Sequence, residues 1–230
     1  MKVLILISAD AEWQAVKKIF PGIRFENGIY GEWFSILSVG HELIYFQGGW
    51  GKISAAATAQ YAIDHFKPGL IINPGSCGGF YGHIELGTII LVEKTIVYDI
   101  FEQMGDAELA LENYSTDLDL SWSIPPYPLN VQRGLLISAD RDIFPGDIDQ
   151  LNSRFGAVAA DWESGAIAWV SKKNNIRCII LRGVTDLVSN VGGDAYNNPG
   201  IFIQRTEELM PILIGQLEYW ITASEKAPYI

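Results

Sequence analysis

The stretch Ala159-Ala160-Asp161-Trp162-Glu163-Ser164-Gly165-Ala166-Ile167-Ala168-Trp169 decides the fold, because it predicts a buried strand that runs directly into an apolar helix. A second apolar run, Cys178-Ile179-Ile180-Leu181-Arg182-Gly183-Val184, leads to Thr185 and Asp186. In open α/β folds, ligand contacts gather outside the carboxyl ends of strands. Glu163 and Asp186 are therefore the candidate active centre, although acidic residues at helix starts also serve as ordinary caps.

The composition predicts a folded, acidic protein. The 230 residues suit one α/β domain over 1–230, and 49% hydrophobic against 19% charged residues exclude a disordered chain. The net charge of -11, without a Lys/Arg run, argues against nucleic acid as a partner. The apolar run at residues 3–7 is too short for a signal core or a membrane span. We expect a cytoplasmic protein without membrane association and with apolar surface for oligomerisation.

The cysteines and histidines indicate no metal and no cofactor. Cys77 and Cys178 have no CxxC spacing, so we expect two reduced thiols rather than a disulfide or a zinc site. His41, His65 and His83 are isolated and lack metal-ligand spacing.

Hydrophobic periodicity predicts the elements of an α/β fold, because strands alternate with helices along the chain. Residues 99–130 lose this periodicity and are predicted to be a long loop. The predicted strands cover residues 2–8, 68–73, 88–97 and 134–138, with an antiparallel hairpin at 31–47, and the predicted helices cover residues 11–20, 53–66 and 202–220, the last bent at Pro211.

Three further segments reach the expected sheet edge. Glu12 lies at a strand-to-helix turn, where it is either functional or simply favourable to the helix dipole. Residues 48–52 form a Gly-rich turn before a helix but lack the spacing of a nucleotide-phosphate motif. The small residues at 73–79 allow either close approach of backbone to a ligand or a plain tight turn.

Taken together, these motifs resemble the nucleoside phosphorylase superfamily, and within it the 5'-methylthioadenosine/S-adenosylhomocysteine nucleosidases. They occur in the family's order over nearly the whole chain. The resemblance implies a twisted central mixed β-sheet flanked by helices, usually assembled as a homodimer. The matching residues are Glu12, Gly49-Trp50-Gly51-Lys52, Ile72-Asn73-Pro74-Gly75-Ser76-Cys77-Gly78-Gly79, Asp161-Trp162-Glu163 with Ala166, and Arg182-Gly183-Val184-Thr185-Asp186.

The family's reaction explains why three carboxylates are needed. Cleavage of an N-glycosidic bond passes through a ribosyl cation, so a base must be protonated, a water activated and the sugar held. By resemblance, Asp186 protonates N7 of the purine, Glu12 activates the water, and Glu163 binds the ribose 2' and 3' hydroxyls. Such a proton donor requires a raised pKa, which burial can supply.

The resemblance also implies a set of substrate-binding residues. Thr185 is expected to orient Asp186, and the purine site is expected to be lined by neighbouring residues and by the backbone at Ile143. The full set comprises Ser76, Cys77, Gly78, Ile143, Asp161, Trp162 and Thr185.

Charge favours water over phosphate as the acceptor. Family phosphorylases hold phosphate with arginines, one of them at the position of Asn73 in this chain. The first loop carries Glu12, whose negative charge repels a phosphate, where phosphorylases keep a glycine.

Three departures from the family leave the 5' substituent and the base open. Trp162 stands where the nucleosidases usually carry Met, and Asp142 where they commonly carry an aromatic residue. Asp142 either accepts a bond from an exocyclic amine or is merely solvated. Residues 99–130, which help to close the family's 5' pocket across the dimer, do not match.

Three alternatives to the nucleosidase function are compatible with parts of the sequence. A hydrolase of futalosine-like nucleosides and a phosphorylase belong to the same superfamily. A non-catalytic nucleoside-binding or storage protein belongs to another class, and the retention of all three carboxylates speaks against it.

Overall fold

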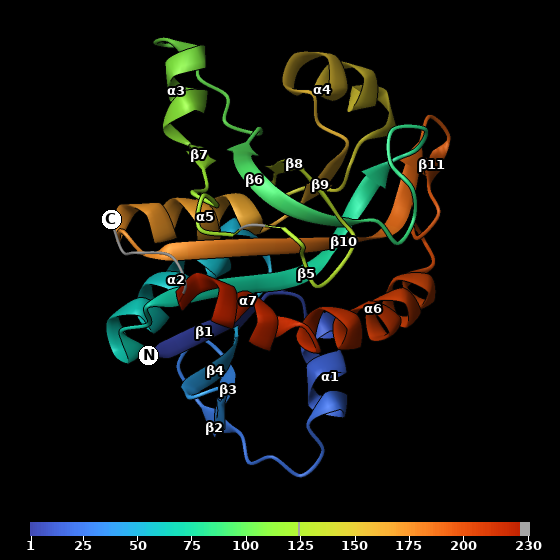
Figure 1. Cartoon of the computed structure of the whole chain (residues 1–230). Coiled ribbons are helices and arrows are strands. Elements are labelled where there is room, and N and C mark those ends of the chain that lie inside the picture. The colour runs from blue at the N-terminus through green and yellow to red at the C-terminus, as the bar shows by residue number, and fades with distance from the viewer. Residues whose placement is uncertain (124, 226–230) are drawn as a thin grey trace.

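The chain forms one eleven-stranded mixed β-sheet with helices on both faces in a computed structural model that describes residues 1–123 and 125–225 (Figure 1). The strands are β1 (Lys2–Ile7), β2 (Glu26–Asn27), β3 (Glu32–Ser38), β4 (His41–Gln47), β5 (Leu70–Phe80), β6 (Ile89–Val97), β7 (Ser115–Asp117), β8 (Val131–Ser138), β9 (Ala159–Asp161), β10 (Arg177–Ser189) and β11 (Gly192–Gly193). The helices are α1 (Asp10–Ile19), α2 (Gly51–Phe66), α3 (Ala107–Asn113), α4 (Ile148–Phe155), α5 (Ser164–Lys173), α6 (Pro199–Ile214) and α7 (Leu217–Glu225), with a 3-10 turn at Pro145–Asp147.

Five strands of the sheet close into a ring. β5 pairs with β10, β10 with β6, β6 with β8, β8 with β9, and β9 again with β5. β1, β4, β3 and β2 extend the sheet from β5. The predicted α/β fold with a central mixed sheet is therefore confirmed, and the sheet curls far enough for β5 and β10 to meet.

β1 shows how both faces of the sheet are covered. Val3, Ile5 and Ile7 are buried in a cluster with side chains of α1, α6 and α7, whereas Leu4 and Leu6 are buried with side chains of α2 and α5. A strand buried on both faces is a continuous apolar run, which is the pattern that predicted it. Among the described residues, no helix is both long and apolar enough to cross a membrane.

The small residues at 73–79 lie within β5, so the tight turn is wrong, while close approach of this backbone to a ligand stays a prediction. A Cβ on Gly75 would lie only 2.7 Å from Glu12 Oε1, and a Cβ on Gly79 would lie 2.7 Å from the side chains of Ile84 and Val184. These glycines are required because neighbouring side chains cross the strand directly above its backbone.

Residues 99–130 are not the structureless loop that was predicted. They contain α3, which Asp106 caps by accepting hydrogen bonds from the amides of Glu108 and Leu109 at 3.0 Å, and β7, which pairs with β6. Both elements are too short to produce a visible hydrophobic period. Ile124, in the same segment, lies outside the described residues.

The C-terminal segment forms two helices instead of the one predicted over residues 202–220. Pro211 lies inside α6, and the chain turns at Gly215 and Gln216 before α7 begins. The amide of Gly215 donates to the carbonyl of Pro211 at 3.0 Å. The missing amide hydrogen of proline affects only the turn that precedes it, so Pro211 lies inside α6 without ending the helix.

Close packing of α6 on β10 generates a stability prediction. A Cβ on Gly183 of β10 would overlap the side chain of Leu209, which is itself buried on α6. We expect Gly183→Ala to lower the free energy of unfolding by about 1–3 kcal/mol because the core becomes overpacked. Thermal denaturation followed by circular dichroism measures the change. Gly134→Ala is the matched control, since a Cβ on this β8 glycine meets no atom within 4 Å; equal stability of the two variants would contradict the close packing.

Candidate active site

The candidate site lies where one edge of β5 lacks a neighbouring strand. β10 runs along the whole of β5, so β1 and β9 share the opposite edge. β1 pairs with residues 70–72 of β5 along this edge, and β9 pairs with residues 78–79 of β5. In the described part of the chain, no strand fills the interval at residues 73–77. Side chains can therefore approach this part of β5 from the side.

A cavity of about 680 Å³ opens at this interval, a size typical of small-molecule sites. The turn after β1, the middle of β5, the loop after β8, the junction of β9 with α5, and β10 all contribute to its wall. All ten site residues predicted from the sequence line it: Glu12, Ser76, Cys77, Gly78, Ile143, Asp161, Trp162, Glu163, Thr185 and Asp186.

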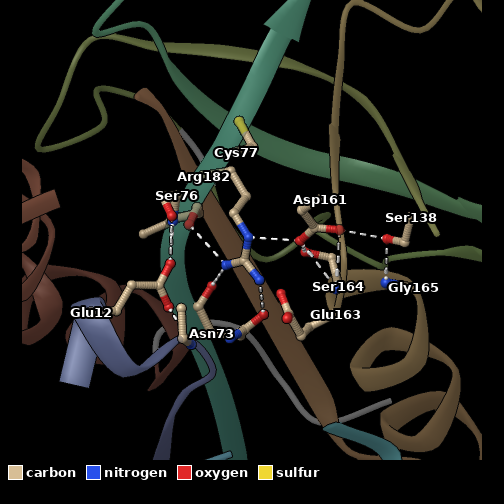
Figure 2. A network of polar contacts seen from close by, with 12 residues as sticks. Glu12, Asn73, Ser76, Cys77, Ser138, Asp161, Glu163, Ser164, Gly165 and Arg182 are labelled. Atoms are coloured by element: carbon tan, nitrogen blue, oxygen red, sulfur yellow. Dashed lines mark hydrogen bonds and ion pairs between the residues drawn. The ribbon is translucent and has the colours of Figure 1, made fainter. Parts of the chain in front are cut away.

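Arg182 is a buried positive charge beside the cavity, with 1% of its side chain exposed. Figure 2 shows Glu12 and Asp161 on either side of its guanidinium. Nε donates to Asp161 Oδ2 at 2.8 Å, and the two terminal nitrogens donate to the backbone and side-chain oxygens of Asn73 at 2.9 and 2.6 Å. Burial opposes the charge, but the carboxylates of Asp161, Glu12 and Glu163 hold the pKa of Arg182 above its ordinary value.

Glu12 is oriented by three hydrogen bonds. Its Oε1 accepts from the amide and the hydroxyl of Ser76 at 2.6 and 2.8 Å, and its Oε2 accepts from the amide of Ala9 at 3.1 Å. The side chain is nearly fully buried, and Gly75 leaves the space that it occupies. The carboxylate is thus fixed at the cavity wall, where it can accept a proton from a bound water.

Glu163 lies immediately before α5, and its Oε1 accepts a hydrogen bond from the amide of Gly51 at 3.0 Å. Burial, together with the charge of Asp161, raises the pKa of Glu163 to about 8. The start of α2, where Gly51 lies, is fixed in turn, since the amide of Lys52 donates to Asp140 at 2.7 Å. A protonated Glu163 at neutral pH offers one donor and one acceptor, which suits a pair of hydroxyl groups.

The carboxylate of Asp161 is bonded to the protein. It accepts from the hydroxyl of Ser138 at 2.6 Å, from the amide of Ser164 at 3.1 Å and from Arg182. These contacts show that the carboxylate of Asp161 neutralises Arg182. Its contact with a substrate stays a prediction.

Thr185 and Asp186 lie inside β10 at a register shift, not beyond the end of the strand as predicted. The Thr185 hydroxyl is 3.3 Å from Asp186 Oδ1, as expected for a residue that orients the carboxyl group. Burial raises the pKa of Asp186 to about 6, and the negative charge of Asp194 adds to the rise. Asp186 therefore exchanges its proton near neutral pH.

Next to Asp186, the space between Gly78 and Ile143 is narrow. A Cβ on Gly78 would lie 2.8 Å from Ile143 Cδ1, so only glycine keeps this part of β5 open. Tyr196 donates its hydroxyl to the carbonyl of Ile143 at 2.6 Å, and burial keeps the thiol of Cys77 neutral by raising its pKa. Asp142 also lines the cavity but is largely exposed to solvent, so neither of its two alternatives is excluded.

Trp162 forms an aromatic wall with Trp50. Their rings stack with centroids 4.8 Å apart and an interplanar angle of 30°. Trp50 is 67% exposed, so the pair marks the boundary between the cavity and the solvent.

Sequence reasoning missed several residues of the site. Arg182 could have been found from its pattern, because an arginine in an otherwise apolar strand requires a buried acidic partner. Tyr196 and Phe202 also line the cavity, but they come from an irregular connection and the start of α6, where no periodic pattern points to them.

Comparisons with known proteins identify the family of this chain. A family model described as the phosphorylase superfamily matches residues 2–213. The 5'-methylthioadenosine/S-adenosylhomocysteine nucleosidase of Buchnera aphidicola subsp. Acyrthosiphon pisum is 31% identical over 202 residues, which cover 83% of this chain and 87% of the relative. The enzyme of the same name from Maridesulfovibrio salexigens is 32% identical over 169 residues, which cover 68% and 73%.

A solved structure shows the same fold. The S-adenosylhomocysteine nucleosidase of Streptococcus pyogenes, in complex with 5-methylthiotubericidin, aligns with a TM-score of 0.76 and 21% identity. The alignment covers 99% of this chain and 98% of the other. The chain therefore belongs to the phosphorylase superfamily and resembles, within it, the 5'-methylthioadenosine/S-adenosylhomocysteine nucleosidases.

Proposed function

We propose that this protein is an N-glycosidase that hydrolyses 5'-methylthioadenosine and S-adenosylhomocysteine, releasing adenine and the 5'-substituted ribose. The proposal rests mainly on the placement of Glu12, Glu163 and Asp186 around one cavity, where burial raises the pKa of Asp186 to about 6 and that of Glu163 to about 8. The named relatives are nucleosidases for these two substrates, which supports the assignment.

The base binds at the Asp186 end of the cavity. Asp186 donates its proton to N7 of the purine, so that the base leaves as a neutral molecule. Thr185 orients the donor, and Cys77, Gly78 and Ile143 line the side where a flat ring fits. The raised pKa of Asp186 supports this role, because an ordinary aspartate has lost its proton at neutral pH.

The sugar binds at the Glu12 and Glu163 end. Glu163 contacts the ribose 2' and 3' hydroxyls, and Glu12 takes a proton from the attacking water. Ser76 holds Glu12 through both its amide and its hydroxyl. Trp162 and Trp50 form the wall beside the sugar. The indole of Trp162 is larger than the Met side chain that the nucleosidases usually carry at this position, so it narrows the space for the 5' group.

Water, rather than phosphate, is the acceptor. Asp10, Glu12, Asp142, Asp161, Glu163 and Asp186 line the cavity, and Arg141 is the only basic residue among its described lining residues. Arg141 is already paired with Asp147 at 2.5 Å. Asn73, at the position where phosphorylases carry an arginine, is fully buried and bonded to Arg182. Asp161 is neutralised by Arg182, but a phosphate dianion would still be repelled by the carboxylates of Glu12 and Asp142 at the cavity wall.

The assembly proposed is a cytoplasmic homodimer. Cys77 and Cys178 are unpaired, which suits a reducing compartment. Phe101, which is 83% exposed, lines a second hollow of about 330 Å³ that shares Arg141 with the main cavity. A second copy that covers Phe101 would shield the mouth of the site.

The release of adenine tests the proposed reaction directly. Purified protein should release adenine from 5'-methylthioadenosine without added phosphate, as measured by chromatography of base and sugar. Glu12→Gln and Asp186→Asn should each lower kcat by about 10²- to 10⁴-fold while the fold is retained, because each removes a general base or a general acid. Asp64→Asn, on the exposed face of α2, is the matched control. Release that requires phosphate would establish a phosphorylase, and full activity of Asp186→Asn would remove the proton donor from the mechanism.

The second prediction concerns pH. Because Asp186 must carry a proton and its pKa is about 6, kcat/KM should fall about tenfold per unit as pH rises above that value. Burial and the charge of Asp161 raise the pKa of Glu163 above that of Asp186, so the onset of the fall just above pH 6 reports Asp186. A profile of kcat/KM for 5'-methylthioadenosine across this range measures it, and a flat profile would contradict the assigned donor.

The third prediction concerns assembly. Phe101→Asp should shift the protein from dimer to monomer in sedimentation velocity, because a charge replaces an apolar contact at the interface. Leu37→Asp, at an equally exposed position near the β3–β4 turn, should leave the dimer intact. A wild-type chain that sediments as a monomer at micromolar concentration would overturn the dimer.

A further inference from the structure

The candidate proton donor follows a β-bulge. Val184 pairs with Cys77 and Asp186 pairs with Gly78, so Thr185 is left without a partner on β5. A bulge re-aims the side chains next to it. In this chain the carboxyl of Asp186 comes to lie over Gly78, where a Cβ would be 3.5 Å from Asp186 Oδ2.

Arg205 of α6 secures the bulge. One of its terminal nitrogens donates to the carbonyl of Thr185 at 2.8 Å and lies 2.6 Å from Asp194 Oδ2. The carbonyl that the bulge removes from the ladder is thereby satisfied by a side chain of a different element. Arg205 thus connects α6 to the residue just before Asp186.

Asp194 secures the residue just after Asp186. Its Oδ1 accepts from the amide of Leu187 at 3.0 Å, and its own amide donates to the carbonyl of Leu187 at 3.1 Å. Asp194 and Arg205 are in turn paired with each other. Both chain neighbours of Asp186 are therefore held by one ion pair.

We propose that Asp194 and Arg205 are positioning residues for Asp186: they clamp its two chain neighbours and place one negative and one positive charge beside its carboxyl group. The inference rests on the proposed function, in which Asp186 protonates the leaving base. Neither residue touches the reacting atoms; both act through Asp186.

The two charges act on Asp186 in opposite directions. After burial, the largest influence on the pKa of Asp186 is Asp194, which raises it, whereas Arg205 lowers it. From the other elements around it, the carboxylate of Asp142 raises the pKa and the Thr185 hydroxyl lowers it. Burial raises the pKa of Cys77 and of Tyr196, so both of these neighbours stay uncharged in the working range.

Because Asp194 and Arg205 shift the pKa of Asp186 in opposite directions, removing each charge should shift the pH profile of kcat/KM in opposite directions. Asp194→Asn keeps an oxygen for the Leu187 amide but leaves Arg205 unbalanced, so the falling limb of kcat/KM should move to lower pH by roughly half a unit, and the rate above the limb should drop about threefold. Arg205→Met should move the limb to higher pH by a similar amount. The double variant should return the limb close to its wild-type position, while its maximal rate stays lowered because the clamp is lost.

Glu207→Gln is the matched control, since Glu207 also lies on α6 in an ion pair, with Lys18. It should leave the limb unchanged. A merely structural role for Asp194 and Arg205 would lower activity in all variants without opposite shifts of the limb. Limbs that coincide in the two single variants would contradict either the positioning pair or the donor role of Asp186, and the carboxyl titration of Asp186 decides between the two.

A titration of the Asp186 carboxyl by ¹³C NMR in the substrate-free enzyme separates this inference from the proposed function. Opposite shifts of the carboxyl titration in the two variants support the positioning pair. If the carboxyl shifts but the kcat/KM limb does not follow, Asp186 is not the proton donor and the proposed function fails, while the positioning pair stands. An unshifted carboxyl titration in both variants overturns the pair, whatever the activity.

Discussion

The buried guanidinium of Arg182 is the interaction on which the rest of the site depends. A charge taken out of water is costly unless it is paired and fully hydrogen-bonded. Asp161 and Asn73 meet that requirement directly, and the carboxylates of Glu12 and Glu163 lie within reach of its field. Without this positive charge, Glu12 and Asp161 would place two buried negative charges beside Glu163. Arg182 thus allows an acidic site to exist inside an apolar sheet.

The position of that charge follows from the sheet. Because β10 covers one edge of β5 entirely, β1 and β9 share the other and leave residues 73–77 open. Gly75, opposite Arg182 in the register, has no side chain to block Glu12 or the guanidinium. The open edge, the absent Cβ and the buried arginine form one arrangement. Each would be unfavourable without the other two.

The acidic groups of the site have different pKa values because their surroundings differ. Glu163 and Asp186 are both buried, but Glu163 faces a further carboxylate, whereas Asp186 lies between an acidic and a basic neighbour. Different surroundings give similar side chains different affinities for protons, which is how one site holds both acids and bases at a single pH. In this chain burial raises both pKa values; Asp161 adds to the rise at Glu163, and Asp194 adds to the rise at Asp186, where Arg205 opposes it.

The sequence by itself determined the elements whose pattern is local. The apolar run of β1, the hairpin of β3 and β4, and the carboxylates that end up around the cavity could all be predicted from short segments. The tertiary structure decided what depends on residues far apart: the closure of the ring through β5 and β10, the partners of Arg182, the bulge at Thr185, and β5 as a strand rather than a turn at 73–79. The physical reason is that periodicity reports which face of an element is buried, whereas ladder pairing, the packing that permits a glycine and the neutralisation of a buried charge are set by the neighbour that the fold brings alongside.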